Sequence, residues 1–143
     1  MGDIRSEIHA AFGEETADIK TYSPLTFAYI GDAVFEIVIR TLIVEKGQRS
    51  ANTLHRHTTK IVCAETQAKM IEAVYEQLSE EERDIYRRGK NTKISSSAKN
   101  ASLADYRKAT GFEALCGYLF LTDNTQRMIE IIQKALELLE IEL

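Results

Sequence analysis

The sequence predicts an all-α protein that folds as one domain of about five to seven helices. Its 143 residues include one Pro and seven Gly, so long helices can run unbroken, and apolar residues recur at helical spacing. With 44% hydrophobic and 28% charged residues, the composition is typical of one compact domain over residues 1–143. No run approaches the roughly 18 apolar residues that span a bilayer, and no secretory signal opens the chain. We therefore expect a cytoplasmic protein without a membrane partner.

The N-terminal half contains one strongly marked helix. Residues 1–20 are weakly patterned, with room for one short helix. Ser23 is a typical N-cap and Pro24 suits the first helical position, after which the apolar run from Leu25 to Val44 continues to a stop at Gly47. Because this helix is apolar nearly all round, we expect it to be central in the fold.

Two further helices follow in the middle of the chain. Ser50 can cap an amphipathic helix that reaches about Gln77. Ser79 and Glu82 form a capping-box pattern, which predicts a short helix that ends at Gly89.

A long polar loop separates these helices from the last two. Residues 90–102 are polar and without periodicity, and long loops often carry function. A fourth helix is predicted over residues 103–121, and a fifth is opened by Asn124 and runs to about Leu139. Cys63 and Cys116 have no metal-ligand spacing, so we expect free thiols and no zinc or disulfide scaffold.

Charge is distributed unevenly along the chain. The net charge is −4, yet residues 83–108 contain eight cations and two acids. A basic segment on an acidic body is typical of a localised contact with a polyanion, although a solvated loop has the same composition.

Two acids stand out because apolar residues surround them. Asp32 and Glu36 lie one turn apart, and we expect Glu36 to face solvent or pair with Arg40. Gly31, before Asp32, is costly in a helix and indicates a close approach of another segment.

Glu113, in the fourth helix, lies between the helical glycines Gly111 and Gly117. If the two helices pack together, Asp32 and Glu113 meet, and two converging carboxylates repel unless a divalent cation lies between them. Oxygen ligands favour Mg²⁺ or Mn²⁺, and a metal beside a basic loop indicates phosphodiester chemistry.

These residues also resemble a known family. YIGDAV at residues 29–34 resembles the signature helix of ribonuclease III, and FEAL at residues 112–115 with Gly117 resembles its second acidic motif. The chain length and the runs Arg88-Gly89-Lys90-Asn91 and Lys99-Asn100 resemble the Mini-ribonuclease III subfamily, over about residues 22–140.

The resemblance implies a homodimeric endonuclease that cleaves double-stranded RNA with Mg²⁺, which Mn²⁺ can replace. Asp32 and Glu113 match the family's metal-binding, catalytic acids. Ala28 and Thr110 stand where ribonuclease III proper has two further acids, a departure that the subfamily shares. Glu65 and Asp105 are candidates to complete the site on charge alone; each is otherwise a surface acid.

We expect the catalytic module to contact RNA itself, since the resemblance includes no separate double-stranded RNA-binding domain. The candidate RNA-binding residues are Arg88, Lys90, Asn91, Lys93, Lys99 and Asn100 around the loop, and His55, Arg56 and Lys60 on the second helix. The histidines are otherwise ordinary exposed helix residues.

The sequence thus predicts metal-assisted hydrolysis, and the family role implied is maturation of the large-subunit (23S) ribosomal RNA precursor. It leaves open whether a ribosomal protein assists cleavage. One alternative is a catalytically silent RNA-binding helical dimer, and a second is a protein-interaction bundle, which leaves the two acids unexplained.

Overall fold

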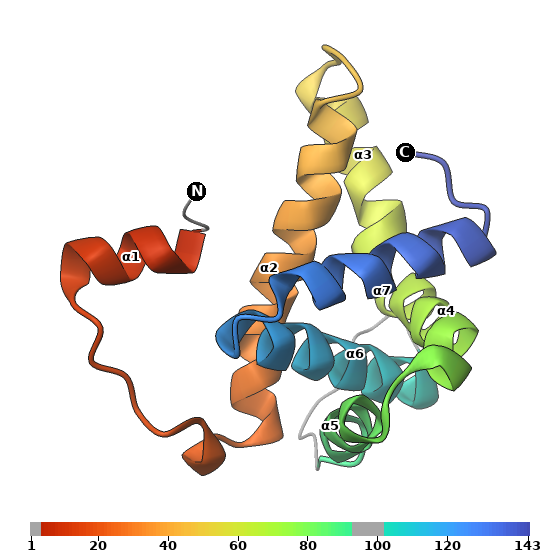
Figure 1. The fold of residues 1–143 in the computed structure, drawn as a ribbon. Helices are drawn as coiled ribbons and strands as arrows, with labels where there is room; N and C mark the ends of the chain where they lie inside the picture. The colour runs from red at the N-terminus through yellow and green to blue at the C-terminus, as the bar shows by residue number, and fades with distance from the viewer. Residues whose placement is uncertain (1–3, 93–101) are drawn as a thin grey trace.

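The computed structural model describes residues 4–92 and 102–143, and these ranges contain helices but no strand. The elements are α1 (Ile4–Phe12), η1 (Ile19–Thr21), α2 (Pro24–Val44), α3 (Ala51–Val62), α4 (Ala64–Val74), η2 (Tyr75–Gln77), α5 (Glu80–Lys90), α6 (Leu103–Leu121) and α7 (Thr125–Leu138) (Figure 1). The prediction of an all-α fold is confirmed, and the fourth predicted helix has the expected bounds.

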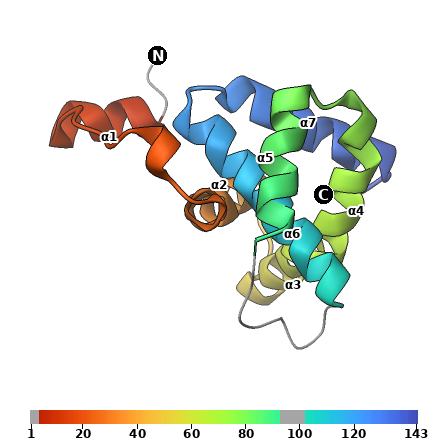
Figure 2. The same ribbon diagram turned by 90° about the horizontal axis from the view of Figure 1, so that it is seen from below.

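Helix α6 is the centre of the fold, with α2, α4, α5 and α7 packed around it (Figures 1 and 2). More than half of its residues are buried, including Phe112 and Leu115. The prediction that the 25–44 helix would be central is wrong: α2 buries one stripe, through Phe35 and Ile39, and leaves apolar residues exposed on its outer face. A run of apolar residues marks a helix with two apolar faces, but it does not say which of them the same chain covers.

The predicted helix over residues 50–77 is divided in two. Cys63 has extended backbone, so α3 ends at Val62 and α4 begins at Ala64 in a new direction. Two side chains donate hydrogen bonds to carbonyl groups that lose their helical partners at the break. Thr66 Oγ1 donates to the Lys60 carbonyl at 2.7 Å, and Gln67 Nε2 donates to the Val62 carbonyl at 2.8 Å. Apolar periodicity continues across the break, which is why the sequence suggested one helix.

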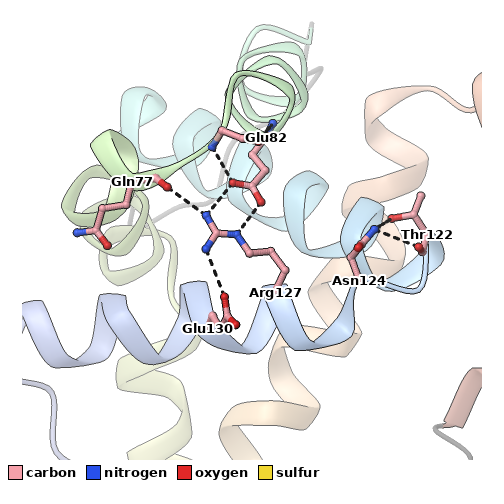
Figure 3. Close-up of polar contacts among 7 residues, drawn as sticks. Gln77, Glu82, Thr122, Asn124, Arg127 and Glu130 are labelled. Carbon is pink, nitrogen blue, oxygen red and sulfur yellow. Dashed lines mark hydrogen bonds and ion pairs between the residues drawn. The ribbon is translucent and has the colours of Figure 1, made fainter.

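Serine caps begin four of the helices, three of them at the predicted residues Ser23, Ser50 and Ser79. The side chains of Ser23, Ser50 and Ser102 each accept a hydrogen bond from a backbone N–H of the first turn, and Ser79 forms the predicted capping box with Glu82. Asn124 precedes α7 but accepts no such bond. Its Nδ2 instead donates to the Thr122 carbonyl at 3.0 Å and to the Thr122 hydroxyl at 2.8 Å (Figure 3).

An ion pair between a buried Glu82 and a partly exposed Arg127 fixes α7 to the start of α5. Glu82 is 7% exposed, and its carboxylate accepts hydrogen bonds from Arg127 Nε at 2.8 Å and Nη2 at 2.9 Å (Figure 3). Arg127 Nη2 also donates to the Gln77 carbonyl at 3.1 Å. The same carboxylate accepts the Ser79 N–H, so the capping box and the interhelical pair share one acid.

Helices α2 and α6 cross in backbone contact through two glycines. A Cβ atom on Gly31 would lie 1.8 Å from the carbonyl oxygen of Glu113, and one on Gly117 would lie 1.9 Å from the carbonyl oxygen of Phe27. Atoms do not approach so closely, so any side chain at either position would push the helices apart. Gly31 therefore has the role that its place inside a helix indicated.

Helix α1 lies apart from the helical body in both views (Figures 1 and 2). It has no buried residue, and an ion pair between Arg5 and Asp123 connects it to the turn before α7.

Cys63 and Cys116 are free, as expected. Over residues 4–92 and 102–143, no helix is long and apolar enough to cross a membrane.

We expect Gly31→Ala to lower the free energy of unfolding by about 3 kcal/mol or more, because the added methyl group meets the Glu113 carbonyl. Helix propensity alone would give the opposite sign, a gain of about 1 kcal/mol. Urea unfolding checks the change. Ala33→Gly, at an exposed position of α2, is the control and should cost only about 1 kcal/mol; a stabilised Gly31→Ala protein would contradict the close crossing.

The Glu82–Arg127 pair should make stability depend on acidic pH. Hydrogen bonding from Arg127 lowers the pKa of Glu82 from its ordinary value of 4.5, although burial opposes the shift. The pair therefore stabilises the fold fully above pH 4.5, and this contribution disappears as the pH falls through the lowered pKa. We expect Glu82→Gln to cost about 2 kcal/mol at pH 7 and to flatten the acid limb of a plot of unfolding midpoint against pH. Glu130→Gln, which removes an exposed pair to Arg127, should change neither.

Candidate active site

The glycine crossing brings Asp32 and Glu113 together. Asp32 follows Gly31 on α2, and the carbonyl of Glu113 on α6 rests against Gly31. The two carboxyl groups lie within hydrogen-bonding reach of each other. Asp32 is exposed and Glu113 is partly buried, so the pair lies at the surface end of a buried helix contact.

The pair is electrostatically strained without a cation. Burial, the hydrogen bond to Asp32 and the negative charge of Asp32 together raise the pKa of Glu113 to about 8. A hydrogen bond from Gln67 acts in the opposite direction. A group whose charged form is disfavoured by a like charge and by burial binds a cation readily, since the cation removes both costs.

Gln67, on α4, is a polar residue of this site that sequence reasoning missed. It is 2% exposed, its Nε2 donates to the Val62 carbonyl at 2.8 Å, and its side chain lies within hydrogen-bonding reach of Glu113. Its Oε1 is buried and has no hydrogen-bond partner among the residues that the structure describes. The signal in the sequence was a Gln in the apolar stripe that contains Met70, Ile71 and Val74.

The donors fit a single hard cation. The two carboxylates offer only oxygen ligands, and Mg²⁺ commonly takes one or two carboxylates and keeps several waters. Over residues 4–92 and 102–143, no three His, Cys, Asp or Glu side chains form a metal-binding group. Neither Glu65 nor Asp105 therefore joins Asp32 and Glu113 in such a group.

The other acids singled out in the sequence have local roles. Glu65 is exposed on α4 and pairs with Lys69 at 3.2 Å. Asp105 lies in the first turn of α6, where its backbone N–H donates to Ser102 Oγ at 3.0 Å. Glu36 accepts a hydrogen bond from Arg40 Nε at 2.8 Å, as expected.

Ala28 and Thr110 are both buried beside the crossing. The Thr110 hydroxyl donates to the Tyr106 carbonyl of its own helix at 3.0 Å, and Ala28 packs with Phe27 and Ala114. Neither side chain carries a carboxylate, so the site has two acids here and not four.

The candidate RNA-binding residues occupy two places. Arg88 and Asn91 are exposed, and Lys90 is partly exposed, at the end of α5; His55, Arg56 and Lys60 are exposed on α3. Lys93, Lys99 and Asn100 lie outside the described residues. His57, between Arg56 and Lys60, has a structural place, with Nδ1 at 3.4 Å from Arg49 Nη1 and Nε2 at 3.3 Å from the Glu142 carbonyl oxygen.

Comparison with known proteins identifies the family. The Ribonuclease III domain family matches residues 25–124, which include both acids of the pair. Mini-ribonuclease 3 of Clostridium tetani is 47% identical over 90% of this chain and 87% of its own length, and that of Streptococcus pneumoniae is 38% identical over 86% of this chain and 98% of its own.

A solved structure has the same fold. The crystal structure of protein FN1578 from Fusobacterium nucleatum superposes with a TM-score of 0.78 at 28% identity, and the match covers 85% of this chain and 99% of that one. The family match covers most of the chain, and several relatives exceed 40% identity over most of its length. The chain, with its paired acids at a glycine crossing, therefore belongs to the Mini-ribonuclease 3 branch of the ribonuclease III family and is an endoribonuclease of that type.

Proposed function

We propose that this protein is a Mg²⁺-dependent endoribonuclease that cleaves double-stranded RNA at the Asp32–Glu113 pair. The observation that carries the proposal is the hydrogen-bonded meeting of these two carboxyl groups on α2 and α6, inside the segment matched by the family. Mn²⁺ has similar oxygen preferences and should replace Mg²⁺.

The residues of the pair have distinct tasks in hydrolysis. A divalent cation, when bound, supplies Lewis-acid activation of the attacking water and of the scissile phosphate. Asp32, exposed, presents its carboxylate at the surface where a phosphate group can approach. Glu113, partly buried and anchored by Gln67, releases its proton when it binds the cation and fixes the position of the site relative to α6. No side-chain nucleophile is required.

The exposed cations supply contacts to the duplex. A-form RNA presents phosphates and 2′-hydroxyls across its minor groove, which a protein reads by shape. Arg88, Lys90 and Asn91 at the end of α5, with Lys93, Lys99 and Asn100 that follow in the chain, and His55, Arg56 and Lys60 on α3, are the proposed phosphate contacts.

We also propose a symmetric homodimer through the outer face of α2. Tyr29 is 82% exposed and Ile37 61% exposed, which is unusual for large apolar side chains. Further along this face, Val38 and Leu42 line an apolar groove of about 1170 Å³ between α2 and α7. A two-fold axis through this outer face would cover it with the same face of a second copy and bring two Asp32–Glu113 pairs to one duplex, one for each strand.

The biological substrate proposed is the 23S ribosomal RNA precursor, by analogy with the role of the subfamily, and a ribosomal protein can assist cleavage by presenting the RNA. A cytoplasmic location agrees with two free cysteines and with this substrate.

Asp32→Asn and Glu113→Gln should each lower the rate of duplex cleavage at least 100-fold, because each keeps the side-chain shape and removes a ligand charge. Glu113→Gln should also raise the melting temperature at pH 7 without metal, since the raised pKa means that Glu113 must take up a proton on folding and Gln need not. Single-turnover cleavage of a labelled duplex in Mg²⁺, with EDTA as the blank, and thermal unfolding are the measurements.

Glu36→Gln is the matched control for these variants, because Glu36 lies one turn from Asp32 but pairs with Arg40. Its cleavage rate should stay within a few-fold of the wild type. Near-full activity of either pair variant would remove that residue from the site. Wild-type protein that binds the duplex but leaves it intact in Mg²⁺ would favour a catalytically silent RNA-binding dimer.

The dimer should sediment at twice the 16.2 kDa of one chain at micromolar concentration. Ile37→Lys, which places a charge on the exposed face of α2, should shift it to monomer mass without unfolding it. Heterodimers of wild-type and Glu113→Gln subunits, isolated with two affinity tags, should nick one strand of a duplex. Cleavage of both strands by such heterodimers at the wild-type rate would show that one pair cuts both strands.

A further inference from the structure

Gln67 is buried at a position where packing alone would favour an apolar residue. It is 2% exposed, and its neighbours Ala68, Met70 and Ile71 on α4 are core residues. A buried amide costs free energy unless its polar atoms are paired. The contacts of its nitrogen and oxygen therefore need separate explanations.

The amide nitrogen has one acceptor at hydrogen-bond distance, and Glu113 lies within its reach. The break between helices α3 and α4 at Cys63 frees the Val62 carbonyl from helical pairing, and Nε2 donates to it at 2.8 Å. The same side chain lowers the pKa of Glu113, against the larger effects of burial and Asp32. The Val62 bond occupies one of the two N–H donors of the amide, and the second N–H is available to Glu113.

The amide oxygen has no such partner. Among the residues that the structure describes, Gln67 Oε1 is the one buried side-chain oxygen or nitrogen without a hydrogen-bond partner. An unpaired buried acceptor costs about 1 to 3 kcal/mol. It belongs to the amide that lies within reach of Glu113, and a hydrated divalent cation held by the acid pair would bring water O–H donors to this part of the fold.

We propose that Gln67 is a positioning residue of the cleavage site, which holds the Glu113 carboxylate from α4 and accepts a hydrogen bond from the hydration shell of the bound divalent cation. The inference rests on the proposed function, because it assumes that Asp32 and Glu113 bind that cation. It gives the break between α3 and α4 a functional consequence, since the Val62 carbonyl released there is the anchor of the amide.

The test is Mn²⁺ binding to the RNA-free protein, measured by isothermal titration calorimetry and by the electron paramagnetic resonance signal of free Mn²⁺. Gln67→Met keeps the volume and removes both polar atoms, and it should weaken Mn²⁺ binding about 10-fold or more. The variant should also need a correspondingly higher Mg²⁺ concentration for half-maximal cleavage, while its affinity for the duplex without metal stays unchanged.

Thr58→Val is the matched control, because Thr58 is also buried and its hydroxyl donates to the Leu54 carbonyl at 2.9 Å on α3. It should lower the melting temperature slightly and leave Mn²⁺ affinity unchanged. If Gln67→Met behaves in the same way, Gln67 only pairs the Val62 carbonyl and the proposal is overturned.

Two further variants keep the test decisive. Should Gln67→Met fail to fold, Gln67→Asn retains the amide but is one methylene too short to reach Val62 and Glu113 together, and the same loss of Mn²⁺ affinity is expected. Glu113→Gln separates the two proposals: Mn²⁺ binding by the wild type that is insensitive to Glu113→Gln contradicts the proposed function itself, whereas binding that needs Glu113 but not Gln67 contradicts only the role of Gln67.

Discussion

The site depends on the contact between the backbones of α2 and α6. Gly31 and Gly117 leave no room for a Cβ atom at the crossing, so the two helices approach until backbone carbonyls touch Cα atoms. This close approach brings the Asp32 and Glu113 side chains within hydrogen-bond reach of each other. Two helix glycines cost stability locally, and the contact they permit is what places the two carboxylates together.

The crossing also creates an electrostatic cost that the rest of the fold must offset. Glu113 is partly buried beside a second acid, which raises the pKa of Glu113 to about 8. Elsewhere the fold pairs its buried charge fully, as Glu82 and Arg127 do between α5 and α7. Glu82 has a cationic partner within the fold, whereas Glu113 has a second acid beside it. An acid without a cationic partner is typical of a site that is completed by a bound ligand.

Helix α2 carries both Asp32 of the acid pair and the exposed face proposed for the dimer. Its inner stripe packs on α6, and its outer face leaves Tyr29 and Ile37 largely exposed, next to the groove that α7 shares. Because Asp32 lies on the same rigid helix, a partner that covers the outer face would also fix the position of one site relative to another. Central burial belongs to α6, which is surrounded by four helices of its own chain.

The sequence by itself determined the helical class, most helix ends and the identity of the acid pair. Ser23, Ser50, Ser79 and Ser102 act through hydrogen bonds within three residues, so local chemistry is enough to place them. Asp32 and Glu113 could also be identified from the sequence, because each lies in a short motif that resembles one of the ribonuclease III family.

Only the tertiary structure decided which apolar face is covered, where the 50–77 region breaks, and what Gln67 does. Apolar periodicity is the same for a face that packs on α6 and for one left to a partner, and it passes unchanged through Cys63. The contacts of Gln67 join α4 to the α3 terminus and to α6, two segments that no local pattern brings together. Such contacts depend on three-dimensional packing, and residue spacing along the chain does not encode them.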